Sequence, residues 1–192
     1  MMRKIVAAIL VIAVLFVAWS AWPFFGLYAL ARTVQSGDIA RIEERVNYPA
    51  LGRSLRSQVL ATYARQTGLP LDRGLIGNLA SAVADPLIAK ILSRVAVAQF
   101  LQNGWPTPVL GDRPPTIPAP NWNALGDVWQ LYANAQYGLR DFSVRLPVNE
   151  PRARQYRVNL TLDGLTWKLT GFELPDELAD RLARELVKQR AS

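Results

Sequence analysis

An unbroken apolar run near the amino terminus constrains this chain more than any other feature. Met1–Lys4 is a short basic head, and Ile5–Trp22 follows as an apolar stretch that only Ser20 interrupts. As a helix, this stretch spans about 27 Å, which is close to the roughly 30 Å hydrocarbon core of a bilayer. The sequence therefore predicts a transmembrane anchor over residues 1–23, with the lipid bilayer as the partner of residues 5–22.

Two alternatives to an anchor are a cleaved signal peptide and a buried core helix. Small residues suit cleavage at Ala18-Trp19-Ser20 or at Ala29-Leu30-Ala31. The apolar region of a signal peptide is shorter, at about 7–15 residues, and we therefore favour an anchor. Arg3 and Lys4 would keep the amino terminus in the cytoplasm, with residues 24–192 across the membrane as one exported domain.

The chain contains neither cysteine nor histidine. This composition excludes disulfides and thiolate sites, and also His-ligated zinc and Ser-His-Asp triads. We expect no metal and no cofactor. The net charge is +7, and without Arg3 and Lys4 there are 20 basic and 15 acidic residues, a net charge of +5. Because the basic residues form no run, nucleic acid is not an expected partner.

Residues 24–102 read as a helical region. Apolar spacing predicts a first helix ending at Gly37, a C-cap residue, and a second capped by Asp38. The step Asn47-Tyr48-Pro49 predicts the start of a third helix. Further helices are predicted over Asp72–Ala84 and Pro86–Gln102. The last is mostly apolar, and it is either central to the core, as we expect, or offers an apolar face to a partner.

Short motifs in this region resemble a known family. The resemblance lies in Tyr28–Asp38, Val46–Leu51 and Ser54–Arg56, and it continues at Trp167–Thr170 and Leu174-Pro175. Together these motifs resemble a bacterial family known as domain of unknown function 2939. Asn47 stands where that family usually has Asp, and Gly52 where it often has Arg. The resemblance implies a membrane-tethered or exported bacterial protein, here single-pass in the inner membrane with a periplasmic domain, and it brings no assigned activity.

We predict a proline-rich loop over residues 103–121, which is either a partner-binding segment or a plain surface connection. The next stretch, Trp122–Tyr137, is rich in aromatic residues, and within it Leu125, Val128, Trp129 and Tyr132 fit one helical face. Its candidate ligand-binding residues are Trp122, Trp129, Tyr132 and Tyr137. The alternative for such an aromatic stripe is a place in the core.

The apolar period then changes from that of a helix to that of a strand. Alternation predicts strands at Phe142–Leu146, Tyr156–Leu162 and Leu165–Leu169. Asp163-Gly164 predicts a two-residue hairpin turn, with Leu162 opposite Leu165 and Leu160 opposite Trp167. The pattern slips at Gly171, which predicts a bulge that bends the sheet. Pro175 opens a terminal helix, whose stripe is Leu178, Leu182 and Leu186.

The predicted fold class is α+β, with residues 122–192 forming a sheet and a terminal helix. Helices packed on a bent antiparallel sheet of three or four strands are analogous to nuclear-transport-factor-2-like and cystatin-like folds, and that analogy says little about function. We expect a non-enzymatic module that binds an apolar ligand or a membrane or envelope protein. Alternatives are a structural subunit of an envelope complex and an enzyme using carboxylates such as Asp38, Asp141, Glu150 and Asp163.

Overall fold

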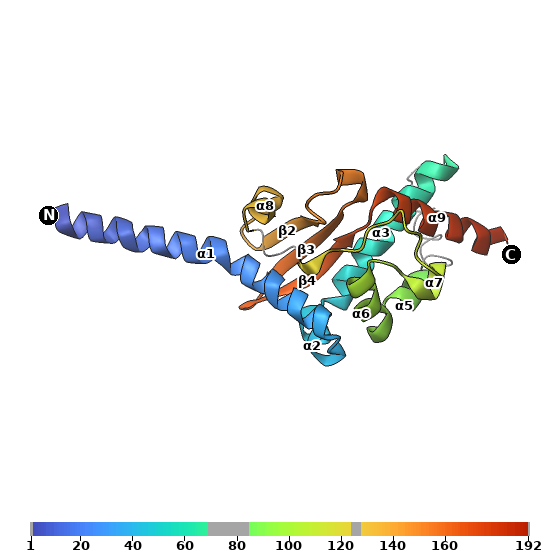
Figure 1. The fold of residues 1–192 in the computed structure, drawn as a ribbon, viewed down its shortest axis with the longest axis horizontal. Helices are drawn as coiled ribbons and strands as arrows, with labels where there is room; N and C mark the ends of the chain where they lie inside the picture. Colours follow the sequence, from blue (N-terminus) through green and yellow to red (C-terminus); the bar gives the residue numbers. More distant parts are fainter. Residues whose placement is uncertain (1, 69–84, 124–127, 192) are drawn as a thin grey trace.

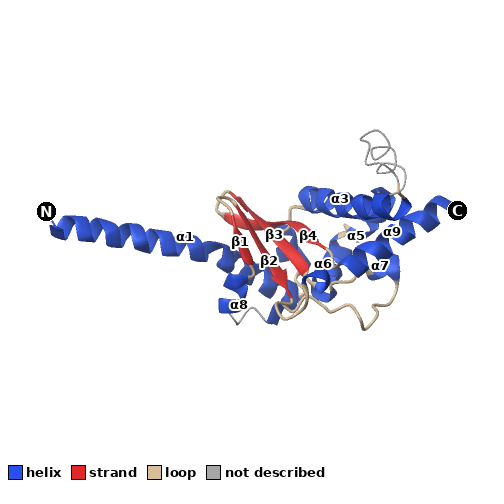
Figure 2. Ribbon diagram, turned by 90° about the horizontal axis from the view of Figure 1, so that it is seen from above, coloured by secondary structure: helices blue, strands red, loops and turns tan. Residues whose placement is uncertain are grey.

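The structure is a computed structural model that describes residues 2–68, 85–123 and 128–191. Its helices are α1 (Met2–Ser36), α2 (Ile39–Arg45), α3 (Tyr48–Thr67), α5 (Asp85–Ile91), α6 (Arg94–Asn103), α7 (Thr107–Leu110), α8 (Val128–Ala133), η3 (Arg152–Arg154, a 3₁₀ turn) and α9 (Asp176–Ala191). Its strands are β1 (Ala135–Tyr137), β2 (Asp141–Leu146), β3 (Tyr156–Asp163) and β4 (Thr166–Glu173). Figures 1 and 2 show α1 projecting from a body in which helices pack around one sheet, so the predicted α+β class is confirmed.

The first helix, α1, continues through the proline that was expected to end the anchor. Pro23 lies inside α1 and is buried against the domain. Residues 2–19 are all exposed, whereas Leu27, Leu30 and Val34 belong to the core. A proline inside a helix removes one backbone hydrogen bond and costs about 3 kcal/mol. Burial of the apolar face beyond it offsets this cost, so one helix both projects from the domain and forms part of its core.

The helix boundaries predicted by capping residues are present. Gly37 follows α1 with a φ of 68°, and the Asp38 side chain accepts a hydrogen bond from Arg41 N at the start of α2. The Asn47 side chain accepts from Ala50 N at the start of α3. Asparagine and aspartate are comparable as N-caps, so Asn47 fills the structural role that an Asp would have at this position.

The prediction of one helix over residues 86–102 was wrong. Two helices, α5 and α6, replace it, with a break at Leu92 and Ser93. The Ser93 side chain caps α6 by accepting from Ala96 N at 3.3 Å, and serine favours such local bonds over a helix interior. The helix predicted at Asp72–Ala84 lies outside the described residues. The proline-rich stretch contains one short helix, α7.

The helix predicted within Trp122–Tyr137 is confirmed only for Val128–Ala133, and the residues after it form a strand. Trp122 and Asn123 form a 3₁₀ turn, Val128–Ala133 is helix α8, and Ala135–Tyr137 is strand β1. Because β1 pairs antiparallel with β2, with Tyr137 opposite Phe142, tertiary pairing overrides the local helical pattern.

The sheet is an antiparallel meander in the order β1-β2-β3-β4. In the β3–β4 hairpin, Leu162 lies opposite Trp167 and Asp163 opposite Thr166. The predicted register was therefore wrong by two residues, and the turn residues are Gly164 and Leu165. Gly164 has a φ of 61°, while none of the described non-glycine residues has a positive φ. This fits a turn that needs positive φ only at its first central position. Because strand periodicity is two, the predicted face survives for Trp167 and Leu169, but Leu165 is exposed.

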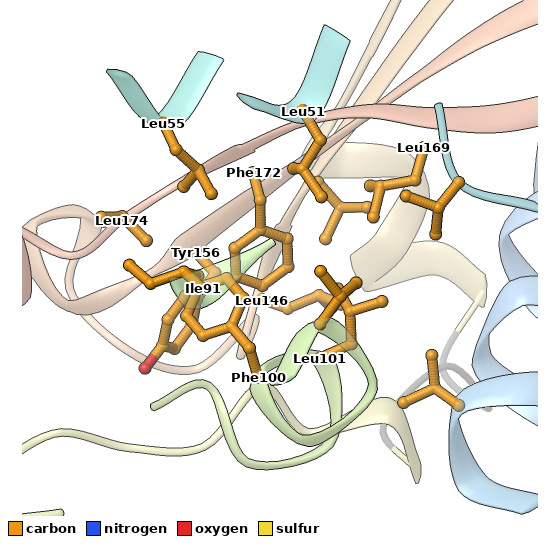
Figure 3. Close-up of a cluster of buried hydrophobic side chains, with 14 of the residues drawn as sticks. Leu51, Leu55, Ile91, Phe100, Leu101, Leu146, Tyr156, Leu169, Phe172 and Leu174 are labelled. Carbon is orange, nitrogen blue, oxygen red and sulfur yellow. The ribbon is translucent and has the colours of Figure 1, made fainter. Parts of the chain in front are cut away.

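A bulge interrupts the β3–β4 ladder close to where the pattern predicted it. Leu160 pairs with Leu169, whereas Asn159 pairs with Gly171, which leaves Thr170 as the extra residue. The shift returns Phe172 to the buried face. Figure 3 shows Leu51 and Leu55 of α3 and Phe100 and Leu101 of α6 gathered around Phe172. The core thus joins helices from the first half of the chain to strands from the second.

The outer edge of β4 is paired by the helical region. Asn47 N donates to Leu169 O at 2.8 Å. Farther along the edge, Gln58 of α3 uses both ends of its amide: Nε2 donates to Phe172 O at 3.1 Å and Oε1 accepts from Leu174 N at 2.9 Å. An open edge strand exposes unpaired backbone groups, and Gln58 satisfies two of them as a neighbouring strand would.

Replacing Gln58 by Met tests this edge contact. Met has a similar length but leaves Phe172 O and Leu174 N without their partner, and each unsatisfied group costs about 1–3 kcal/mol. We expect the free energy of unfolding, measured by urea titration in detergent, to fall by about 2 kcal/mol. The control is Arg53→Met on the exposed face of the same helix, which we expect to be close to neutral. Equal stability of the two variants would contradict the role of Gln58.

A second prediction concerns the crossing of α1 over β4. A Cβ atom added at Gly26 would lie 2.4 Å from Trp167 Cβ. Gly26→Ala should therefore force α1 and β4 apart, and overpacking of this kind costs about 1–3 kcal/mol. We expect a lower unfolding midpoint for Gly26→Ala than for Arg32→Ala, an exposed position on the same helix. An unchanged midpoint for Gly26→Ala would show that the helix crosses elsewhere.

Candidate functional site

A cavity of about 250 Å³ lies where α1 leaves the domain. Helix α1 contributes Phe16, Trp19, Ser20 and Pro23 to its lining. The domain contributes Tyr132 of α8, Tyr137, Gly138, Leu139, Asp141 and Trp167. We call it the junction cavity. It is smaller than the roughly 300–1,000 Å³ of sites for drug-sized ligands, so its size suits one chain or ring of a larger molecule.

Aromatic rings pack together beneath the junction cavity. Phe24 of α1 lies 5.1 Å from Phe142 and 5.9 Å from Tyr137 between ring centroids, both edge to face. Tyr132 and Tyr137 are 5.6 Å apart, and Trp167 lies 6.4 Å from Phe142. Such pairs add about 0.5–1.5 kcal/mol beyond their buried area. The rings therefore hold α1, β1, β2 and β4 together at the point where the cavity opens.

The polar groups around the cavity are sparse. Ser20 Oγ donates to Phe16 O at 2.8 Å, and Asp141 Oδ1 accepts from Thr161 Oγ1 at 3.0 Å. Trp167 Nε1 is buried without a hydrogen-bond partner among the described residues. Pro23 has no N–H, so the Trp19 carbonyl lacks the donor that a helix normally supplies. Apart from these few polar groups, the walls of the junction cavity are apolar.

The four aromatic residues predicted for ligand binding are divided by the structure. Tyr132 and Tyr137 both line the junction cavity, with 56% and 43% of their surface exposed. Trp122 lies elsewhere in the core, and its Nε1 donates to Leu101 O at 2.7 Å. Residue 129 lies on α8, and its side chain is outside the described part of the structure. Ligand binding by Tyr132 and Tyr137 stays a prediction.

Sequence reasoning missed the cavity residues contributed by other elements. Phe16 and Trp19 were assigned to the anchor, and Trp167 to the inner face of the hairpin. Nothing in the local pattern joins them, because their meeting depends on α1 crossing β4 at Gly26. The aromatic residue at the far end of the apolar run, Trp19, was the available signal, since such rings favour a membrane interface.

The carboxylates suggested for catalysis have structural partners. Asp38 caps α2, and Asp163 forms an ion pair with Lys168 at 2.7 Å, which lowers the pKa of Asp163. Asp141 accepts from Thr161, and Glu150 lies 3.9 Å from Arg154. Within residues 2–68, 85–123 and 128–191, no group of three acidic residues is placed to hold a metal ion.

A second, polar hollow of about 410 Å³ lies over the outer face of the sheet. Arg157 lines this hollow and contacts Gln136, Ser143 and Glu173. Across the hollow, Thr161 Oγ1 and Thr170 Oγ1 are 3.0 Å apart. Since these side chains bond one another, the hollow offers less unused hydrogen-bonding capacity than its polarity suggests.

The fold and site define an α+β domain built on a long apolar helix, with an aromatic cavity at their junction. A family model described as "Protein of unknown function (DUF2939)" matches residues 11–103, and this part of the chain belongs to that family. The motifs at Trp167–Thr170 and Leu174-Pro175 lie outside the match. Neither the curated proteins nor the solved structures include a significant match to this chain.

The burial of Tyr137 beside Tyr132 predicts that Tyr137 ionises at a higher pH than an ordinary tyrosine. Burial raises the pKa of Tyr137 to about 12, and the neighbouring Tyr132 adds to the rise. Since the folded pKa exceeds the unfolded value near 10, the stabilising contribution is complete below pH 10 and is lost as pH rises through 12. Burial also raises the pKa of Tyr48 and of Tyr156, so Tyr137 is one of several tyrosines that ionise late. We expect ultraviolet difference spectra to show one fewer late-ionising tyrosine in Tyr137→Phe than in the unaltered chain. The exposed Tyr28→Phe should leave the number of late-ionising tyrosines unchanged. An unchanged number in Tyr137→Phe would refute the assignment.

Proposed function

We propose that this chain is a non-enzymatic, membrane-anchored module whose junction cavity binds an apolar ligand or a membrane partner. The proposal places it in a bacterial inner membrane, with the amino terminus in the cytoplasm and the domain in the periplasm. The observation that supports it most is the division of α1. Its first part is apolar and exposed, and its second part is built into the core.

The exposed part of α1 is unsuited to water. Of the helices in the described ranges, α1 alone is long and apolar enough to cross a membrane, and a signal sequence would pass the same test. Its exposed side chains include Ile9, Leu10, Ile12, Leu15 and Phe16, each more than half accessible. A contiguous apolar surface of this extent marks a membrane or protein contact, and a bilayer satisfies all sides of a helix at once.

The buried part of α1 argues against removal as a signal peptide. Leu30 and Ala31, at one of the two suggested cleavage sites, are buried in the part of α1 that packs into the core. Cleavage there would remove Leu27 and Leu30 from the core. Cleavage near Ala18 would remove Phe16 from the junction cavity. Both products lose contacts that the folded domain makes, which favours an uncleaved anchor.

The non-enzymatic part of the proposal rests on the chemistry present. The chain has no histidine or cysteine, and the carboxylates once suggested for catalysis cap a helix or bond to neighbours. The junction cavity has apolar walls and one carboxylate, Asp141. These features suit binding of an apolar group better than general acid-base catalysis, which needs a positioned proton donor or acceptor.

A charge placed in the apolar run tests the anchor. An arginine at the centre of a membrane helix costs about 2.5–3.5 kcal/mol on insertion scales. We therefore expect Val11→Arg to shift the expressed chain from the carbonate-resistant membrane fraction to the soluble or aggregated fraction. Val95→Arg, at an exposed position on α6, is the matched control and should stay in the membrane. Release of the unaltered chain from the membrane fraction by carbonate would contradict the proposal.

A further inference from the structure

The two hairpin turns of the sheet lie at the same end of the molecule. Residues 138–140 join β1 to β2, and Gly164 and Leu165 join β3 to β4. The turns are tied together, because Leu162 N donates to Arg140 O at 2.8 Å and Arg140 Nη2 donates to Leu162 O at 3.1 Å. Each turn presents a leucine with 77% of its surface exposed, Leu139 and Leu165. We call this surface the turn end.

The turn end faces the projecting part of α1. Figures 1 and 2 both show the hairpin turns on the side of the domain from which α1 emerges. The lining of the junction cavity defines more closely where the turn end lies along α1, because Leu139 lines the cavity together with Phe16, Trp19 and Ser20. The β1–β2 turn therefore lies beside residues 16–20 of α1.

This position along α1 places the turn end at the membrane boundary. Phe16 is six residues before Trp22, or about 9 Å along the helix. If the membrane segment ended before Phe16, residues 2–15 would span only about 21 Å, which is short of the roughly 30 Å hydrocarbon core. A segment long enough to cross therefore carries the β1–β2 turn to the interfacial depth of about 5–10 Å at which apolar faces insert.

The chemistry of the turn end fits that depth. Trp19, Tyr132 and Tyr137 line the junction cavity together with Leu139 and are exposed, and tryptophan and tyrosine concentrate at membrane interfaces. Arg140 is exposed beside Leu139 and suits a lipid phosphate. The opposite end of the sheet differs, because Arg152, Ala153 and Arg154 are exposed there. The apolar tips are confined to the end next to the anchor.

We propose that the turn end, with Leu139 and Leu165 at its tips, is a second membrane contact that docks the domain onto the bilayer in which α1 is anchored. This inference rests on the proposed anchor. The occupant is the lipid surface, because one rigid helix carries both the membrane segment and the wall of the cavity beside the tips. The junction cavity then opens among lipid chains, which makes an acyl chain its nearest apolar ligand.

Single-cysteine labelling of the full chain tests this docking, since the protein has no native cysteine. The variants are Leu139→Cys, Leu165→Cys, the anchor reporter Val11→Cys, and the control Ala153→Cys at the opposite end. Each is labelled with an environment-sensitive fluorophore and reconstituted into vesicles of phosphatidylethanolamine and phosphatidylglycerol. A fraction of the lipid carries a quencher near the headgroup. We expect quenching at both tips to exceed that at Ala153→Cys at least twofold.

The outcomes separate docking from anchoring. Quenching at Val11→Cys by lipids with a deep quencher, without quenching at the tips, would overturn the docking and leave the anchor intact. No quenching at Val11→Cys would overturn both. If the tips are unquenched in vesicles but crosslink to a protein in native membranes, docking onto lipid is also overturned. The turn end would then contact a protein. A further Leu165→Asp change should reduce quenching at Leu139→Cys, because a carboxylate resists entry into the interface.

Discussion

The crossing of α1 over β4 is the contact on which the rest of the structure depends. Gly26 has no side chain, and this lets the helix approach Trp167 so closely that a single added carbon would clash. The approach brings Phe24 into the aromatic cluster with Tyr137 and Phe142. It also forms the junction cavity, whose walls come from the helix and the sheet. Without it, the apolar helix would be a tether and the cavity would not exist.

The family match covers helices but not the sheet on which they pack. Residues 11–103 contain most of α1 and continue to the end of α6. Leu51, Leu55 and Phe100 from this part surround Phe172 from β4 (Figure 3). The edge of β4 is satisfied by Asn47 and Gln58. The matched segment is thus one side of a shared core, and the sheet completes it.

Local signals in the sequence predicted much of the fold. Gly37, Asp38 and Asn47 marked helix ends because capping is decided by neighbouring backbone groups. Strand alternation predicted the sheet, and its face survived an error of two residues in register. Strand β1 was missed because three residues become a strand only by pairing with β2. The junction cavity was missed for the same reason: Trp19 and Trp167 meet only through tertiary packing, so only its two tyrosines were anticipated.

The unbroken course of α1 has a mechanical consequence. Because no linker separates the projecting helix from the domain, the two tilt and rotate together as one rigid unit. A transmembrane helix tilts when its apolar length exceeds the local thickness of the bilayer. With α1 anchored, a change in membrane thickness would therefore reorient the whole domain, and with it the polar hollow around Arg157 on the outer face of the sheet. Under the proposed anchoring, the physical state of the lipid would set the orientation of this protein surface.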